Sequence, residues 1–352
     1  MSDKKVRQED IARALNISRT TVARAFSGQH VTEETRARVL AAAKELGYVH
    51  NSIATTLAMK NSKTVYCFII GTIDEGYCTQ MKQGIDEVTN LWNGYNFKIR
   101  VFVTDINQQG NKRHEQLDQF YEAVNEQKPD GVIFSALCSE NMRAVTAYCK
   151  QHDIPLMSLD LIYRDNALCH IGPDYYSFGE VSAAYLASLM KKNGKILALA
   201  YDDGYELSNL RMHGFYHWLE TNCPQITCRR VAVDNISYGT YKRALEESLA
   251  GFEPDAIYAP YKMDHVIQAL EKLRPQHSYI MISNGINPAI EQYLTSGVIS
   301  GIISVNPYRL GVTAANNFFK YFYRSSEIVR GELDMGCDIY IRENYRRDTR
   351  LF

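Results

Sequence analysis

The sequence lacks the features that mark secreted, membrane-spanning and zinc-binding proteins. Eight cysteines are scattered along its 352 residues, but none forms a CxxC pair and no histidine lies at zinc-ligand spacing from them. The opening segment MSDKKVRQED is polar, and apolar runs such as Val65–Ile70 are far shorter than the roughly 18 residues of a membrane span. We therefore expect a soluble, cytoplasmic protein with reduced thiols, no bound metal and no membrane partner.

Sequence motifs of common enzymes are missing as well. No GxxxxGK[ST], GxGxxG, GxSxG or HExxH pattern occurs, so a phosphate cradle, a nucleophile elbow and a metalloprotease helix are all disfavoured. Acidic residues and histidines are plentiful but form no spaced catalytic constellation. We expect no enzyme activity, no catalytic residues and no cofactor. An enzyme with an appended binding domain is the alternative, and turnover of a bound compound would reveal it.

Length and charge indicate a basic head on a larger body. The length fits two or three domains, and a composition of 45% hydrophobic and 22% charged residues is typical of globular chains. Residues 1–60 hold ten Lys and Arg against six Asp and Glu, whereas the remainder holds 29 against 34. A compact basic segment of this kind is typical of a module that binds phosphates electrostatically.

Apolar residues at helical spacing predict three short helices near the N-terminus, over Gln8–Ala14, Arg19–Phe26 and Glu33–Leu46. Ser18 and Thr32 are placed as N-caps. Only three residues separate the first two helices, and Asn16 at the centre of this turn tolerates a left-handed backbone. This spacing predicts a helix-turn-helix whose seam is formed by Ile11, Leu15 and Val22.

The outward face of the second predicted helix carries Arg19, Thr20 and Arg24, with Ser18 and Thr21 at its N-terminal end. Arginine can bond guanine edges bidentately in the major groove, and hydroxyl groups at a helix N-terminus suit phosphate oxygens. The face is therefore a candidate for reading DNA. The alternative is a solvated basic surface without a partner.

The segment QEDIARALNISRTTVARAFSGQHVTEETRARVLAAAKELGYVHNSIATTLA resembles the headpiece of the lac/galactose repressor family, and the resemblance covers residues 7–58. It implies that Arg19, Thr20 and Arg24 read bases. The implied phosphate contacts are Ser18, Thr21, Thr32 and Thr35, with His30 as a further contact.

The same resemblance implies a hinge helix within residues 51–61, on which Asn51, Ala54 and Leu57 match the family pattern. Leu57 would be the apolar wedge that unstacks a central base step. His50 stands where the family usually has proline, which puts the stiffness of the hinge in doubt, and Asn16 stands where glycine is commonest. As an alternative, Leu57 packs only against its own domain.

From Thr64 onward, short apolar runs alternate with helical stretches. The runs TVYCFIIG, FKIRVFV, DGVIFSA and IPLMSLD form one series, and KILALAY, CRRVAVD, PDAIYAP and YIMISN form a second. This alternation predicts an α/β fold with two doubly wound parallel-sheet lobes, which resembles the type I periplasmic-binding-protein core of the same family. The expected domains are residues 1–50, the hinge 51–61, an N-terminal lobe of 62–172 and 304–331, and a C-terminal lobe of 173–303 and 332–352.

Ligands of open α/β sheets bind beyond the C-terminal ends of the strands, so an effector is expected between the two lobes, near residues that follow strands, such as Ser135, Asp160 and Tyr261. The resemblance implies that Asp160 and Arg211 contact it, with Ser135 and Asn284 as further contacts. Tyr77 or Tyr238 could cover the apolar face of a sugar ring. The alternatives are an internal salt bridge for Arg211 and a loop or cap hydrogen bond for Asp160.

One departure from the family pattern bears on the effector. Pro260-Tyr261 stands where the family commonly has Asn-Asp, so a hydroxyl-bonding pair is lost. The departure puts free-sugar chemistry in doubt and leaves room for a bulkier, more apolar, phosphorylated or non-sugar effector.

These features predict a transcription regulator, with repression as the family's usual sign. We expect a homodimer on a near-palindromic double-stranded operator, because one helix-turn-helix buries too little DNA surface for tight specific binding. No apolar heptads follow the last expected strand, which favours a dimer over a tetramer. A small molecule, a sugar or a derivative, would control DNA affinity through lobe closure. The alternatives are a soluble small-molecule-binding protein with a vestigial DNA-binding head and regulation by a partner protein.

Overall fold

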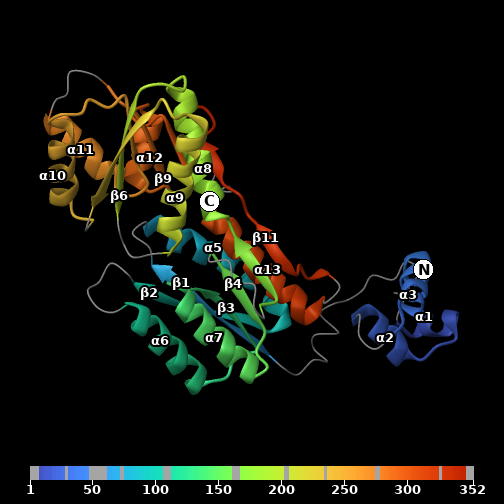
Figure 1. Ribbon diagram of the computed structural model, residues 1–352. Coiled ribbons are helices and arrows are strands. Elements are labelled where there is room, and N and C mark those ends of the chain that lie inside the picture. The colour runs from blue at the N-terminus through green and yellow to red at the C-terminus, as the bar shows by residue number, and fades with distance from the viewer. Residues whose placement is uncertain are drawn as a thin grey trace.

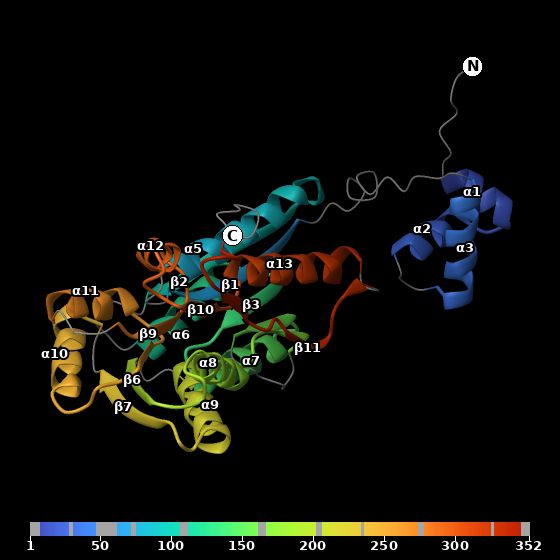
Figure 2. The ribbon, with the colours of Figure 1, turned by 90° about the horizontal axis from the view of Figure 1, so that it is seen from above.

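The computed structural model describes residues 8–27, 31–46, 62–71, 75–105, 112–160, 167–201, 206–233, 236–273, 278–324 and 327–345. In two perpendicular views, a small helical head lies apart from a body of two lobes (Figures 1 and 2). The expected fold class is confirmed. Within the described ranges, no helix combines the length and the apolar character needed to cross a bilayer.

The head consists of the three expected helices, α1 (Gln8–Leu15), α2 (Arg19–Ser27) and α3 (Glu33–Glu45). They enclose a small core in which Ile11, Val22 and Val39 are fully buried. The turn between α1 and α2 contains Asn16 with a left-handed backbone (φ 52°). An asparagine therefore meets the backbone requirement that the turn imposes.

The first lobe is a six-stranded sheet with the order β11-β5-β4-β3-β1-β2, and all of its pairings are parallel. Its strands are β1 (Lys63–Gly71), β2 (Phe97–Asp105), β3 (Gly131–Ser135), β4 (Leu156–Leu159), β5 (Cys169–Gly172) and β11 (Gly331–Asp334). Its helices are α5 (Glu75–Leu91), the 3₁₀ turn η1 (Asn93–Tyr95), α6 (Lys112–Glu126), α7 (Ser139–Gln151) and α13 (Pro307–Tyr323).

Strand β1 shows why the run TVYCFIIG is apolar throughout. Val65 and Cys67 pack with residues of α5 and α13, whereas Tyr66 and Phe68 pack with residues of α6 and α7. Helices therefore cover both faces of the sheet, and alternate side chains of a central strand are buried on opposite sides.

The second lobe repeats this plan with the order β12-β10-β9-β8-β6-β7. Its strands are β6 (Lys195–Tyr201), β7 (Thr227–Val233), β8 (Ala256–Ala259), β9 (Ile280–Asn284), β10 (Gly301–Ser304) and β12 (Asp338–Tyr340), of which β12 pairs antiparallel with β10. Its helices are α8 (Tyr175–Leu189), α9 (Glu206–Asn222), α10 (Tyr238–Leu249), α11 (Met263–Leu273) and α12 (Pro288–Thr295).

The chain passes between the lobes after β5, after β10 and after β11. Strand β11 pairs with β5 in the first sheet through Asp334, so the last passage lies beyond the boundary expected at residue 331. Because the carboxyl ends of parallel strands lie at one edge of each sheet, these passages bring the two edges to face each other.

Candidate DNA-binding and effector sites

The second helix of the head has one buried and one exposed side. Val22 and Ala25 are completely buried against the other two helices. Arg19, Thr20 and Arg24 are exposed, which places the three expected base readers on the outside of α2. Arg19 Nε lies 3.1 Å from Oε1 of Glu9, but both side chains are largely solvated, so this pair is weak.

Two of the four hydroxyl residues expected to contact phosphate, Ser18 and Thr32, cap helices. Ser18 Oγ accepts a hydrogen bond from the backbone N–H of Thr21 (3.0 Å), and Thr32 Oγ1 accepts one from that of Thr35 (3.3 Å). Both caps lie at exposed helix N-termini, where the partial positive charge favours an anion. His30, Asn51, Ala54 and Leu57, and with them the expected hinge at 51–61, lie outside the described residues.

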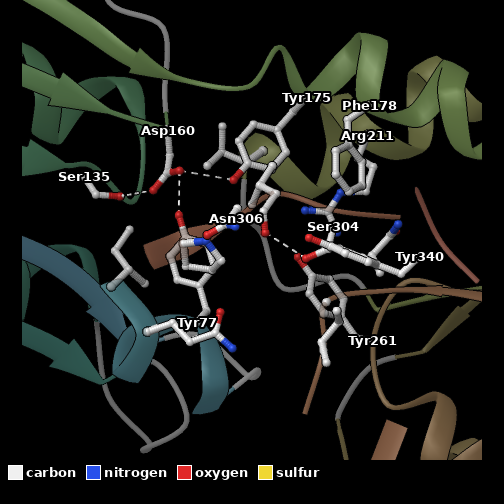
Figure 3. A pocket seen from close by; sticks show the side chains of 18 residues that line it. Tyr77, Ser135, Asp160, Tyr175, Phe178, Arg211, Tyr261, Ser304, Asn306 and Tyr340 are labelled. Atoms are coloured by element: carbon white, nitrogen blue, oxygen red, sulfur yellow. Dashed lines mark hydrogen bonds between the residues drawn. The ribbon is translucent and has the colours of Figure 1, made fainter. Parts of the chain in front are cut away.

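A cavity of about 100 Å³ lies between the lobes (Figure 3). It is several times the roughly 10–15 Å³ that one water molecule needs. Five of the six expected effector residues line it. Tyr77, Ser135 and Asp160 come from the first lobe, and Arg211 and Asn284 come from the second.

Asp160 lies at the end of β4 with a left-handed backbone (φ 62°) and is 4% exposed. Its Oδ1 accepts hydrogen bonds from the hydroxyls of Tyr77 (2.7 Å) and Tyr175 (3.3 Å), and its Oδ2 accepts one from Ser135 Oγ (3.0 Å). Burial raises the pKa of Asp160, while these hydrogen bonds and the charge of Arg211 oppose the rise. The site therefore holds a desolvated carboxyl group whose orientation is fixed by three donors.

Arg211 projects from α9 into the cavity and is 8% exposed. Its guanidinium carbon lies 5.3 Å from the ring centroid of Tyr175, 4.8 Å from that of Phe178 and 5.3 Å from that of Tyr261. Aromatic faces stabilise a desolvated guanidinium through cation–π attraction. The aromatic rings therefore hold a buried cation on the second-lobe side of the cavity, opposite Asp160 (Figure 3).

Asn284 lines the cavity, but its amide group is engaged by the protein. Its Oδ1 accepts from the hydroxyl of Tyr258 (2.6 Å), and its Nδ2 donates to the carbonyl of Ile303 (3.1 Å) and to Ser182 Oγ (3.5 Å). These bonds join the end of β9 to the neighbouring strands β8 and β10 and to helix α8, and they help to hold the cavity wall in shape.

Tyr238 does not line the cavity. It begins α10, and the ammonium nitrogen of Lys272 lies 4.6 Å from the centroid of its ring. The preceding strand, β7, is the outermost strand of its sheet, so the residues after it lie away from the centre of the lobe interface. The structure therefore does not bring Tyr238 together with the other expected effector residues.

Other aromatic side chains line the cavity instead, namely Tyr175, Phe178, Tyr261 and Tyr340. Tyr261 belongs to the expected strand ends, and Tyr175 follows β5 closely enough for the same rule to find it. Tyr340 lies on the antiparallel strand β12, far along the chain, and no local signal in the sequence indicates it.

Comparisons with known proteins agree with this arrangement. A model of the periplasmic binding protein domain matches residues 66–322, and a model of the bacterial regulatory proteins of the lacI family matches residues 9–51. The chain joins a lacI-family head to a periplasmic binding protein domain. The matched head contains the exposed face of α2, and the matched body contains every residue of the cavity except Tyr340.

Curated relatives of the chain include the HTH-type transcriptional regulator MalR of Staphylococcus xylosus, which is 27% identical over 216 residues and 60% of each chain. The catabolite control protein A of Staphylococcus epidermidis is 26% identical over 192 residues. The chain thus spans 60% of the length of the first relative and 54% of the second.

Solved structures share the fold of the body. GanP, a glucose-galactose binding protein from Geobacillus stearothermophilus, aligns with a TM-score of 0.69 at 16% identity over 81% of this chain and 99% of its own. A putative LacI transcriptional regulator from Bacteroides fragilis aligns with a TM-score of 0.68 at 18% identity over 81% and 100% of the two chains.

Proposed function

We propose that the protein is a sequence-specific DNA-binding transcription regulator, a repressor that binds a near-palindromic operator as a homodimer. A small molecule between its lobes sets its affinity for DNA. The observation that carries the proposal is the exposed face of α2 around Arg24, presented by a head in which the seam residues Ile11 and Val22 are fully buried. Two such heads on a two-fold symmetric site would provide the area and the charge that specific DNA binding needs.

Arg19, Thr20 and Arg24 read bases in this proposal, and the capped N-termini at Ser18 and Thr32 contact phosphates. Arginine at an exposed recognition helix suits guanine, and the helix N-terminal N–H groups suit phosphate oxygens. The protein acts in the cytoplasm, where its DNA lies, and catalyses no reaction.

The effector in this proposal is a sugar or a sugar derivative. GanP is a glucose-galactose binding protein by name, and its fold is that of the body. Asp160 and Arg211 offer a carboxylate and a guanidinium on opposite sides of the cavity, which suits hydroxyl groups at two edges of one ligand. Five aromatic side chains line the cavity: Tyr77, Tyr175, Phe178, Tyr261 and Tyr340. They favour a ligand with an apolar or ring face over a fully hydroxylated one.

The test is a selection of bound duplexes from random DNA by the purified full-length protein. A panel of sugars, sugar phosphates and aryl or alkyl glycosides is then added to the enriched site. Enrichment of a two-fold symmetric sequence whose affinity one compound changes supports regulator, dimer and effector together. Failure to enrich any sequence at low salt contradicts the DNA-binding proposal.

A small-molecule-binding protein with a vestigial head is the competing function, and the cavity itself favours it as much as it favours the regulator. The exposed arginines of α2 distinguish the two. If a compound from the panel binds the protein while no DNA sequence is preferred over another, the binding-protein function replaces the regulator.

A further inference from the structure

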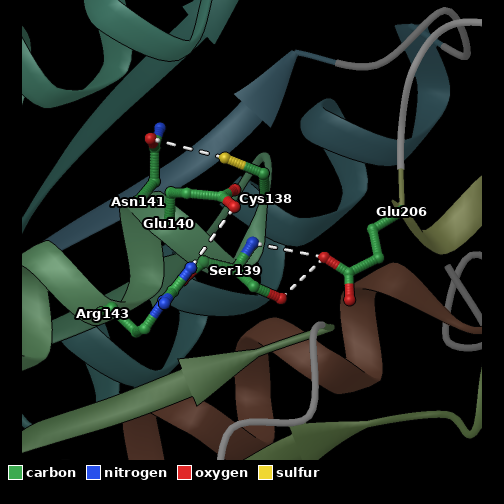
Figure 4. Close-up of polar contacts among 6 residues, drawn as sticks. All are labelled: Cys138, Ser139, Glu140, Asn141, Arg143 and Glu206. Atoms are coloured by element: carbon green, nitrogen blue, oxygen red, sulfur yellow. Dashed lines mark hydrogen bonds and ion pairs between the residues drawn. The ribbon is translucent and has the colours of Figure 1, made fainter.

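The lobes also touch beside the cavity, where the N-termini of α7 and α9 meet (Figure 4). Glu206, the first residue of α9 in the second lobe, places its Oε2 against Ser139, the first residue of α7 in the first lobe. The backbone N–H of Ser139 donates to this oxygen at 3.2 Å and the Ser139 hydroxyl donates at 2.7 Å. One carboxylate oxygen therefore accepts two hydrogen bonds across the lobe interface.

This contact contributes to the capping of helix α7. Its own N-cap residue, Cys138, has no side-chain cap hydrogen bond to the helix, and the Cys138 thiol bonds instead to Oδ1 of Asn141 (3.5 Å). The first N–H groups of a helix have no intrahelical acceptor and carry a partial positive charge. Glu206 supplies both an acceptor and a negative charge from the opposite lobe.

The loop between β3 and α7 links this contact rigidly to the cavity. Gln116 is completely buried; its Nε2 donates to the carbonyl of Ser135 (2.9 Å), and its Oε1 accepts from the N–H of Leu137 (3.0 Å) and from Nδ2 of Asn141 (2.9 Å). Ser135, which donates to Asp160, and Ser139, which donates to Glu206, therefore lie on one fixed segment.

On the other side of the interface, α9 carries Glu206 and the cavity residues Leu207 and Arg211 within its first two turns. Leu207 is 8% exposed and packs with the first-lobe core around Tyr66, Phe68 and Phe134. The N-terminal turn of α9 is thus docked on the first lobe by one polar contact and one apolar contact.

We infer that Glu206 is a positioning residue for the effector: by clamping α9 to α7, it holds Arg211 of the second lobe at a fixed distance from Asp160 of the first. This inference rests on the proposed function of the cavity. Glu206 is not among the residues that line the cavity, so it acts through the lobe arrangement. A ligand that contacts both lobes binds more weakly when the arrangement it needs is less populated.

The first experiment needs no effector. Amide hydrogen exchange of the Ser139–Met142 segment is measured in the full-length protein, in Glu206→Gln and in Glu220→Gln. Glu220 is the matched control, because it is exposed on the same helix as Glu206 and pairs with Arg230 of β7. We expect exchange roughly 3- to 10-fold faster in Glu206→Gln alone, the range of a partly exposed charged hydrogen bond. Equal exchange rates in the two variants would contradict the inference that Glu206 holds α9 against α7.

The second experiment measures the dissociation constant of the compound that the panel identifies. We expect Glu206→Gln to weaken its binding by about 3- to 10-fold, because loss of the contact makes the lobe arrangement that the ligand needs less populated. Ser139→Asp places a second carboxylate against Glu206 and should weaken binding further and increase the radius of gyration in small-angle scattering. Unchanged affinity in both variants overturns the inference.

The two experiments distinguish the positioning role of Glu206 from the proposed effector-binding function of the cavity. If no compound binds, the proposed effector site fails, while exchange and scattering still report whether Glu206 holds the lobes together. If a compound binds and Arg211→Ala abolishes its binding, but Glu206→Gln binds it as the unaltered protein does, the effector site stands and the positioning role of Glu206 fails.

Discussion

The backbone of Gly179 lies directly against the backbone of Arg211. A Cβ atom at position 179 would lie 1.9 Å from the carbonyl oxygen of Arg211, and one at Gly214 would lie 2.0 Å from that of Tyr176. Helices α8 and α9 therefore cross with no side chain between them at these points. The depth at which Arg211 enters the cavity is set by this close approach.

Gly179→Ala is expected to push α9 away from α8 because a methyl group has no space there. Overpacking of this kind lowers the free energy of unfolding by about 1–3 kcal/mol. Urea denaturation followed by circular dichroism measures the change. Gly239→Ala is the matched control, since this helical glycine has open space around it and should gain about 0.5–1 kcal/mol from helix propensity. Equal effects of the two changes would show that the crossing is not tight.

Arg24→Ala is expected to weaken operator binding by about 1–3 kcal/mol and to relax the preference at one base pair of each half-site. Binding is measured at fixed salt against a set of operators with single base changes. Arg38→Ala removes the same charge from an exposed position of α3 and serves as the control. A uniform loss on all sequences with Arg24→Ala would make this residue a phosphate contact.

Arg211→Ala is expected to abolish the response of DNA binding to the effector while the affinity for the operator without effector stays the same. Arg211→Lys keeps the positive charge but loses the planar group that lies over three aromatic rings, so it should restore little of the response. Operator titrations with and without the compound measure both variants. A normal response in Arg211→Ala would show that the effector binds elsewhere.

Asp160 should make the stability of the protein depend on pH in the acid range. Its pKa is raised by burial, so between the ordinary aspartate pKa and this raised value the folded state binds a proton that the unfolded state does not. Stability therefore falls as pH rises through this window and levels off above it. Urea denaturation from acid to neutral pH should show this fall for the unaltered protein relative to Asp160→Asn. If the free energies of unfolding of the two proteins changed in parallel with pH, the raised pKa of Asp160 would be contradicted.

Local patterns were sufficient for most of the fold. The runs TVYCFIIG and KILALAY predicted β1 and β6 to within one residue, because continuous apolar runs bounded by polar residues are typical of strands covered on both faces. The helix-turn-helix was predicted from the positions of Ile11, Val22 and Asn16, since helical periodicity and a tight turn are local properties. The strand-end rule likewise indicated Ser135, Asp160 and Tyr261 as cavity residues.

Residues whose surroundings come from distant segments were not predictable in this way. The sequence by itself determined that Asp160 follows an apolar run typical of a buried strand, and the family resemblance indicated Arg211. Only the tertiary structure decided that Tyr238 lies away from the cavity, that Tyr340 enters it from an antiparallel strand and that Glu206 reaches Ser139 in the opposite lobe. Periodicity fixes the direction of a side chain relative to its own element, whereas the partner of that side chain depends on how whole lobes pack.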